Sequence, residues 1–437
     1  MGAIPGGIDP SGGPPMAIPL RHFVVGLGFL LAAATVALID AAGIHVDQGG
    51  IAFVHLFLVG WVCVTIMGAM TQFVPVWSGT LLHSRRLAVV QLWLVGGGVP
   101  VLVGAWLSGG GWPLAVGGTL MTAGFWTFVY NIGRSLLSAR PLDVTERHFL
   151  VALGYFLVLT VLGLLLAASH AGMASGLPVR VGELSRAHLT VAVFGAVLTT
   201  VWGALYQLST MFTQSEVTWL DTTLQRVEEG TYPIGVLFLA TGRLMTAPGL
   251  ARVGGMLVIL GTAAAGAFLA RRLLGARVGW NPMLHRYAVA VVGIAAWAIG
   301  ATFAWTGDTL GPTTRFGGPG SFTLLAIGIV GFVVFGTLYH VIPFIVWVHR
   351  YSDELGVRAV PMIDDLYDDR LAAADLVFLL VGTGGLLLAD VMAGTTVGLL
   401  GSVALAIGAT LFVTNMVLVI DRHSPHTVGE LVAGRLA

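Results

Sequence analysis

The 437-residue sequence contains no lysine, only one cysteine and very little charge. All 21 basic residues are arginine, and charged residues make up 10% of the chain against 56% hydrophobic residues. The single Cys63 excludes a disulfide framework within the chain. A sequence so poor in charge is not that of a soluble globular protein. Its formal net charge is zero, and we expect no nucleic-acid partner.

The motifs of familiar soluble enzymes are also missing. There is no phosphate-binding loop, dinucleotide fingerprint, zinc-protease helix or nucleophile elbow in a suitable context. Paired acidic residues do not run through the apolar segments, as we would expect in a proton-coupled transporter. The sequence alone leaves open whether the protein is an enzyme.

Long apolar runs dominate what is present. Crossing about 30 Å of hydrocarbon takes roughly 20 residues of helix, and runs of this length in lipid satisfy their backbone polar groups only as helices. The sequence therefore predicts an all-α polytopic membrane protein with about twelve transmembrane helices in a lipid bilayer. The expected spans are residues 22–42, 51–75, 87–108, 113–136, 148–169, 186–212, 231–247, 252–271, 286–305, 322–347, 371–391 and 396–420.

The positions of the arginines predict the orientation. Arginines such as Arg85 and Arg86 concentrate in the loops after even-numbered spans, whereas Arg180, Arg186 and Arg315 are exceptions on the other side. The positive-inside rule then puts both termini in the cytoplasm, and we expect the protein in the plasma membrane.

The two ends of the chain are expected to lie outside the membrane. Residues 1–20 are rich in glycine and proline and lack the features of a signal peptide, so they are expected to be a disordered cytoplasmic leader. Residues 421–437 are expected to be a cytoplasmic tail. The stretch between them, 21–420, is expected to form one membrane domain.

A short motif occurs three times at nearly constant spacing. It reads Gly-Ala-Met-Thr-Gln from Gly68, Gly-Ala-Leu-Tyr-Gln from Gly203 and Gly-Thr-Leu-Tyr-His from Gly336, at intervals of 135 and 133 residues. Such a repeat in a membrane protein predicts related units that pack against one another. We expect three pseudo-symmetric four-helix units, at about 20–140, 141–280 and 281–420. Spans two, six and ten are then equivalent.

Two histidines open equivalent spans. His55 begins the second span and His188 the sixth, both near the expected outer face. Ionisable groups within a span are costly and suggest function, and neutral imidazole is a ligand for haem iron and other transition metals. The alternative for each is an interfacial histidine that reaches water.

The repeated motif also places polar side chains near the expected inner face. If the units are equivalent, these side chains form a polar inner layer. Its members are Gln72, Gln207, Tyr206, Tyr339 and His340.

Twelve spans in a threefold repeat, with key residues on spans two, six and ten, resemble subunit I of the haem-copper oxidase superfamily. The similarity is to its C-family oxidases and nitric oxide reductases. In such proteins span two opens with a histidine ligand of the low-spin haem, a position that His55 matches. Span six opens with a ligand of the active-site metal, which His188 matches, and span ten ends in a phrase like 335–343. The resemblance implies haem and copper as cofactors and an electron-donor subunit as a partner.

The sequence departs from this pattern at other ligand positions. Where the family has two histidines at the start of span ten, this chain has Ser321 and Thr323, and span seven lacks the histidine pair for copper. A hydroxyl is a poor iron ligand beside imidazole, so reduction of oxygen or nitric oxide by the family mechanism is not expected. The NnrS-like haem- and copper-containing membrane proteins are a second resemblance, carried by the stretch from His55 to Gly79.

Two hypotheses follow from these residues. In the first, a haem-copper oxidase-like protein binds haem or a metal through His55 and His188, and serves respiratory or nitric-oxide-related electron transfer or sensing. In the second, a transporter or sensor scaffold keeps the fold without cofactors, and the polar inner layer lines a central cavity. A full terminal oxidase would need ligands from unexpected positions.

Overall fold

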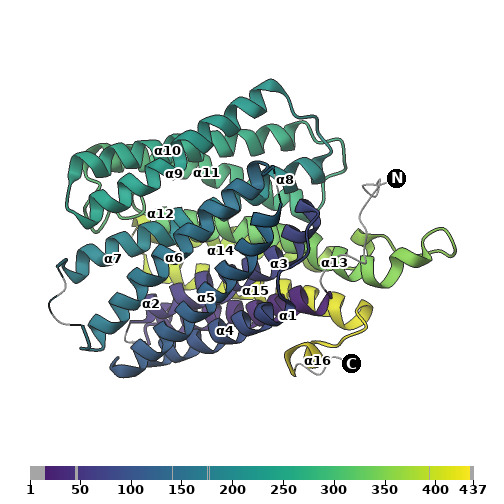
Figure 1. Ribbon diagram of the computed structural model, residues 1–437, viewed down its shortest axis with the longest axis horizontal. Coiled ribbons are helices and arrows are strands. Elements are labelled where there is room, and N and C mark those ends of the chain that lie inside the picture. The colour runs from purple at the N-terminus through teal and green to yellow at the C-terminus, as the bar shows by residue number, and fades with distance from the viewer. Residues whose placement is uncertain are drawn as a thin grey trace.

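The computed structural model describes residues 15–44, 48–139, 141–174, 176, 178–392 and 394–433. Residues 1–14 of the expected leader and 434–437 of the expected tail lie outside this part of the chain. All regular elements within it are helical, and twelve long helical segments pass back and forth through one bundle (Figure 1). This confirms the prediction of an all-α polytopic membrane protein.

Each of the twelve expected spans coincides with one helical segment. The segments are α1 (Ala17–Ala41), α2–η2–α3 (Gly49–Val54, His55–Cys63, Val64–Ser78), α4 (Arg85–Leu107), α5 (Trp112–Ser138), α6 (Val144–His170), α7–η3–α8 (Val181–Thr190, Val191–Leu198, Thr199–Thr213), α9 (Trp219–Leu244), α10 (Pro248–Leu274), α11 (Pro282–Gly307), α12–η4–α13 (Ser321–Thr323, Leu324–Gly331, Phe332–Tyr351), α14 (Asp369–Met392) and α15 (Thr395–His423). Three short elements, η5 (Ser352–Glu354), η6 (Ile363–Asp365) and α16 (Val428–Ala433), lie between or after them.

Ten of these segments are long and apolar enough to cross a membrane by themselves, and α5 and α9 are not among the ten. The helix α9 begins at Trp219, well before the apolar run expected from residue 231. Its first turn is capped by Thr218, whose backbone N–H donates to Asp221 at 2.7 Å. A charged first half therefore precedes the apolar half of this helix.

Helices α9 and α10 form the tightest pair in the bundle's upper part (Figure 1). A Cβ on Gly254 would come within 2.2 Å of the Leu239 nitrogen, and one on Gly242 within 2.4 Å of the Ala251 nitrogen. Only glycine permits so close an approach between backbones. This contact explains how two spans separated by residues 245–247 alone can lie side by side.

Helices extend into the described parts of the expected leader and tail. The first helix begins at Ala17, inside the stretch expected as leader, and Leu20 and Phe23 are fully buried. The Arg21 Nε donates to the Leu431 carbonyl of α16 at 2.7 Å. The described part of the tail is therefore fastened to the start of the first helix.

The three motif glycines make equivalent contacts with the first helix of their own unit. In each case a Cβ on the glycine would crowd a basic side chain near the start of that helix, so the two helices cross closely there. The contacts are Gly68 with the His22 Cβ at 2.6 Å, Gly203 with the His148 Cβ at 2.5 Å and Gly336 with the Arg286 Cβ at 3.1 Å.

The three equivalent helical segments also share a backbone irregularity. Each contains a π-helical stretch between two α-helical parts, namely η2, η3 and η4. Such stretches are rare, and they are frequent at functional sites. Figure 1 shows α2, α7 and α12, which precede them, at one end of the bundle, while α16 lies at the other.

Candidate functional site

Each candidate ligand position lies at or just before the start of a π-helical stretch. His55 is the first residue of η2, His188 precedes η3 by three residues, and Thr323 directly precedes η4. All three positions therefore lie at the same level of the bundle, next to backbone that departs from regular α-helix.

His55 and His188 approach each other from different helices. The Nδ1 of His55 lies 2.9 Å from the Ile51 carbonyl, and that of His188 lies 3.3 Å from the Leu159 carbonyl. Because a carbonyl only accepts, both rings carry their proton on Nδ1 and leave Nε2 with a free lone pair. The two imidazoles are close enough to interact electrostatically, and both side chains are half-buried.

A glycine determines the position of the His188 ring. A Cβ on Gly163 of α6 would come within 2.9 Å of the His188 Cε1. The Cε1 edge of the ring therefore packs against the α6 backbone, where only glycine leaves room for it. This packing holds the imidazole in one orientation, as metal-binding histidines require.

The hydroxyls at the start of the tenth span have structural roles. The Ser321 Oγ accepts from the Gly318 N–H at 2.7 Å, and the Thr323 Oγ1 donates to Asp390 at 3.2 Å. Among the described residues, no group of three or more His, Cys, Asp and Glu side chains is arranged to hold a metal ion. The described residues therefore do not reproduce the three-ligand copper site of the oxidase pattern.

Aromatic rings fill much of the interior beside the π-helical stretches. Trp61 is completely buried, with its ring centroid 4.6 Å from that of Phe335 and 4.9 Å from that of Phe57. In the second unit, the Tyr232 hydroxyl donates to the Phe194 carbonyl in η3 at 2.8 Å. This bond satisfies a carbonyl at the point where the helix loses its regular ladder.

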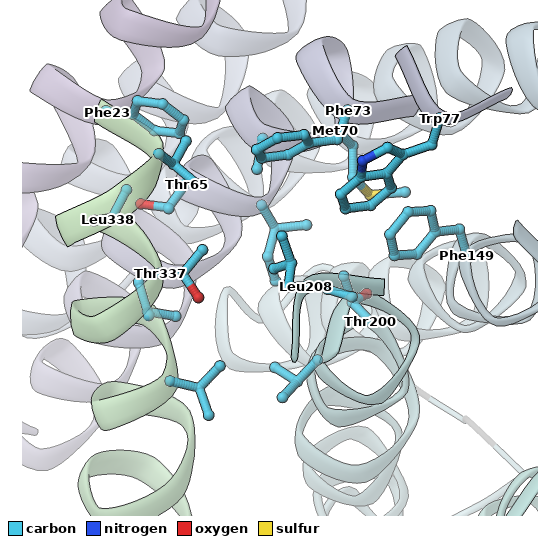
Figure 2. Close-up of a pocket in the computed structure, with 17 residues that line it drawn as sticks. Phe23, Thr65, Met70, Phe73, Trp77, Phe149, Thr200, Leu208, Thr337 and Leu338 are labelled. Atoms are coloured by element: carbon cyan, nitrogen blue, oxygen red, sulfur yellow. The ribbon is translucent and has the colours of Figure 1, made fainter. Parts of the chain in front are cut away.

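A small cavity lies between α3, α8 and α13, where the three units meet (Figure 2). It encloses about 70 Å³, far below the roughly 300–1,000 Å³ typical of small-molecule pockets. Its polar side chains are three threonines, Thr65, Thr200 and Thr337, and the remainder are apolar, including Phe73 and Leu208.

None of the five residues of the polar inner layer lines this cavity, in contrast to the expectation for a cofactor-free scaffold. Tyr206 follows the lining residue Ala204 by two positions, which is roughly 200° around a helix of 3.6 residues per turn. Tyr339 stands in the same relation to Thr337. The ring of His340 instead packs on Phe212, with centroids 4.2 Å apart.

Gln72 and Gln207 also lie away from the cavity. The Gln72 side chain is buried, and its Oε1 has no hydrogen-bond partner among the described residues. Gln207 is half-buried. The five side chains therefore point in several directions and do not surround one space.

Sequence reasoning missed two buried carboxylates near the opposite end of the bundle. Glu228 is fully buried, and its Oε2 accepts from the His148 Nε2 at 2.6 Å and from the Tyr206 hydroxyl at 2.9 Å. Glu228 precedes the span expected from residue 231, but it lies inside the bundle because α9 begins at Trp219. We refer to these three residues as the second-unit cluster.

The third unit contains the equivalent cluster, centred on Asp375. This carboxylate binds both Arg286 and the Tyr339 hydroxyl, and the Asn415 Nδ2 donates to that hydroxyl at 3.2 Å. Arg286 and Asp375 are both fully buried. We refer to these residues as the third-unit cluster. Glu228 lies before the expected span 231–247, whereas Asp375 lies inside the expected span 371–391, where its pairing with Arg286 was not foreseen.

The first unit has no carboxylate at the corresponding positions. His22 lies at the contact with Gly68, Thr71 stands where the other units have tyrosine, and Gln91 is buried on the unit's third helix. The Nε2 of His22 and both polar atoms of Gln91 have no hydrogen-bond partner among the described residues. The repeat thus keeps three polar positions while only two units carry charge there.

Arg134 and Arg243, both located in apolar runs, have different environments. Arg134 is exposed, as expected for a side chain that reaches the membrane surface. Arg243 is 1% exposed, and its guanidinium donates to the Thr190 hydroxyl at 2.8 Å. Thr190 follows His188 by two residues, so Arg243 packs against the same stretch of α7.

Comparison with known proteins agrees with this architecture. No protein-family model and no curated protein matches the sequence. Among solved structures, the chain is similar to a cryo-EM structure of a haem-copper terminal oxidase dimer, with a TM-score of 0.72 and 13% sequence identity over 94% of this chain and 85% of that chain. Identity at this level shows the fold alone. The protein therefore has the haem-copper oxidase subunit I-like fold that the threefold repeat predicted.

Proposed function

We propose that this multi-pass membrane protein holds one haem or metal centre between His55 and His188, and that it serves electron transfer or sensing in respiration or in the response to nitric oxide. The observation that supports this most directly is the placement of the two imidazoles within electrostatic range of each other at one end of the bundle. They come from different units, interact electrostatically and both leave Nε2 free.

The chain's own residues would orient such a centre. The Ile51 and Leu159 carbonyls fix the proton on Nδ1 of each ring, and Gly163 fixes the plane of the His188 ring. His55 and His188 would hold a haem through their free Nε2 atoms, and such a group would supply electron transfer. The aromatic packing around Trp61 excludes water from the neighbouring helices.

Full oxidase chemistry is not part of this proposal. Ser321 and Thr323 are engaged in hydrogen bonds that organise the start of α12 and its contact with α14. A catalytic haem would lack its proximal imidazole, and copper would lack two of three ligands. Electron transfer or sensing demands fewer ligands and fits the two histidines better.

The setting of the centre is part of the same proposal. The arginine distribution favours cytoplasmic termini in the plasma membrane, which places the two histidines near the outer face. An electron-donor subunit docking at that face is the expected partner, because electrons would enter there by the shortest route.

An optical spectrum with metal and haem analysis of the purified protein tests this function. We expect a Soret band or a stoichiometric metal in the wild type, lost in both His55→Ala and His188→Ala. His170→Ala is the matched control, because that histidine is exposed at the same end of the bundle. A folded wild type with neither haem nor metal would refute the proposal and favour the cofactor-free scaffold.

A further inference from the structure

Three arginines from distant parts of the chain gather near His188. Arg186 lies on α7, Arg243 near the end of α9, and Arg315 in the loop that joins α11 to α12. Contacts link the three segments: the Thr190 hydroxyl, which accepts from Arg243, donates to the Arg186 carbonyl at 2.7 Å. The Trp305 ring against the Arg243 guanidinium donates to the Thr314 carbonyl, next to Arg315, at 2.7 Å. Arg186 and Arg315 are two of the exceptions to the positive-inside pattern. A shared role in this cluster would explain why both arginines occur on that side.

Arg243 is held rigidly at the centre of this cluster. It is 1% exposed, its Nε donates to the Thr309 carbonyl at 3.1 Å and its Nη1 to the Thr190 hydroxyl at 2.8 Å. Its guanidinium carbon lies 5.4 Å from the centre of the Trp305 ring. None of these neutral partners compensates the positive charge.

Each arginine of the cluster also keeps a donor free. The Arg243 Nη2, the Arg186 Nε and the Arg315 Nε are buried without a hydrogen-bond partner among the described residues. Buried donors on a charged group are normally satisfied. Three unsatisfied guanidinium donors at one place therefore indicate a missing acceptor.

The protein itself provides little negative charge here. Within the described part of the chain, Asp308 is the carboxylate that acts on Arg243. Asp308 is exposed, and its Oδ1 already accepts from the Leu310 N–H at 2.8 Å. Glu183, one turn before Arg186 on α7, is already paired with Arg180 at 3.2 Å. These carboxylates leave the three guanidinium groups with excess positive charge.

We propose that Arg186, Arg243 and Arg315 form a binding site for a phosphate group, either free inorganic phosphate or the headgroup of an anionic phospholipid. Guanidinium binds phosphate through two parallel hydrogen bonds, and a phosphate offers enough acceptor oxygens for all three free donors. The buried Arg243 anchors the anion, while the half-buried Arg186 and Arg315 leave a way in from the membrane boundary. This site is independent of any haem or metal at His55 and His188.

The test uses the purified full-length protein in detergent without phosphate. Thermal unfolding is followed with added sodium phosphate in one arm and with added phosphatidylglycerol in the other. Sodium chloride at equal ionic strength controls for charge screening, and phosphatidylcholine controls for lipid bulk. Stabilisation by phosphate assigns a free anion, and stabilisation by phosphatidylglycerol alone assigns a lipid headgroup.

Variants locate the effect. Arg186→Gln and Arg315→Gln should each weaken binding of the stabilising anion about tenfold or more, as expected for loss of a charge-assisted hydrogen bond. Arg252→Gln is the matched control, because Arg252 is exposed at the same end and donates to the Gly307 carbonyl at 3.1 Å. The proposal is overturned if neither anion stabilises the wild type beyond its control, or if Arg252→Gln weakens binding as much as the other two variants.

Discussion

Replacement of Asp375 by asparagine offers the sharpest test of the packing described above. Asp375→Asn preserves side-chain volume, so its effect reports on charge and not on a cavity. The partner Arg286 is fully buried and also donates to the Pro282 carbonyl at 2.7 Å and the Ala372 carbonyl at 2.9 Å. The substitution therefore leaves a guanidinium in the bundle interior without a counter-charge.

The magnitude follows from the cost of an uncompensated buried charge. Removing one partner of a buried ion pair typically destabilises a protein by about 3–5 kcal/mol. The Arg286 guanidinium retains its two carbonyl acceptors and lies 4.3 Å from the Tyr339 ring centre. These neutral contacts favour the lower end of that range, about 3 kcal/mol.

A double variant separates charge from packing. In Arg286→Met with Asp375→Asn no charge remains buried, and the asparagine oxygen still accepts from the Tyr339 hydroxyl. We expect this variant to be more stable than Asp375→Asn alone by about 1–3 kcal/mol, because replacing both members of a buried ion pair costs less than removing one. The first unit, with His22 and Gln91 at the corresponding positions, shows that the fold accommodates a set without a carboxylate.

The assay is reversible unfolding in mixed detergent micelles, followed by tryptophan fluorescence. Asp369→Asn is the control, because Asp369 is exposed on the same helix. The reasoning fails if Asp375→Asn is as stable as this control, or if the double variant is no more stable than the single one.

Two further substitutions test helix packing at other places. Gly203→Ala should destabilise the protein by about 1–3 kcal/mol through overpacking, since the new Cβ would lie 2.5 Å from the His148 Cβ. The control Gly154→Ala, with no atom within 4 Å of the new Cβ, should leave the unfolding midpoint unchanged or higher. Equal effects of the two substitutions would contradict the contact. Arg21→Ala removes the bond to the Leu431 carbonyl, so limited proteolysis should cleave the C-terminal segment faster while the bundle stays folded. Unchanged cleavage would show that this bond does not hold α16.

The helical framework was predictable from the sequence because it depends on local properties. A run of about 20 apolar residues satisfies its backbone in lipid only as a helix, and all twelve expected runs are helical. The spacing of Gly68, Gly203 and Gly336 identified equivalent helices, and these carry the equivalent glycine contacts and π-helical stretches. His55 and His188 followed from the same repeat.

Pairing between distant residues was not predictable. The burial of Glu228 inside the bundle is compensated by His148, 80 positions away, which donates a hydrogen bond to it. The burial of Asp375 is compensated in the same way by Arg286, 89 positions away, which donates a hydrogen bond to its carboxylate. Nothing in the sequence indicates which distant residue pairs with which carboxylate. Both carboxylates also lie close in sequence to other charged residues. Arg186, Arg243 and Arg315 are likewise far apart in the sequence, so their proximity was not predictable either.

The sequence by itself determined which segments are helices and which of them are related, because length, hydropathy and repetition are properties of the chain. Only the tertiary structure decided where the polar side chains point. Each residue turns a helix by roughly 100°, and spans that are apolar on every side carry no pattern that marks the inward face. Tyr206 and Tyr339 were therefore assigned to a shared central layer, whereas helix rotation directs each of them to a carboxylate of its own unit.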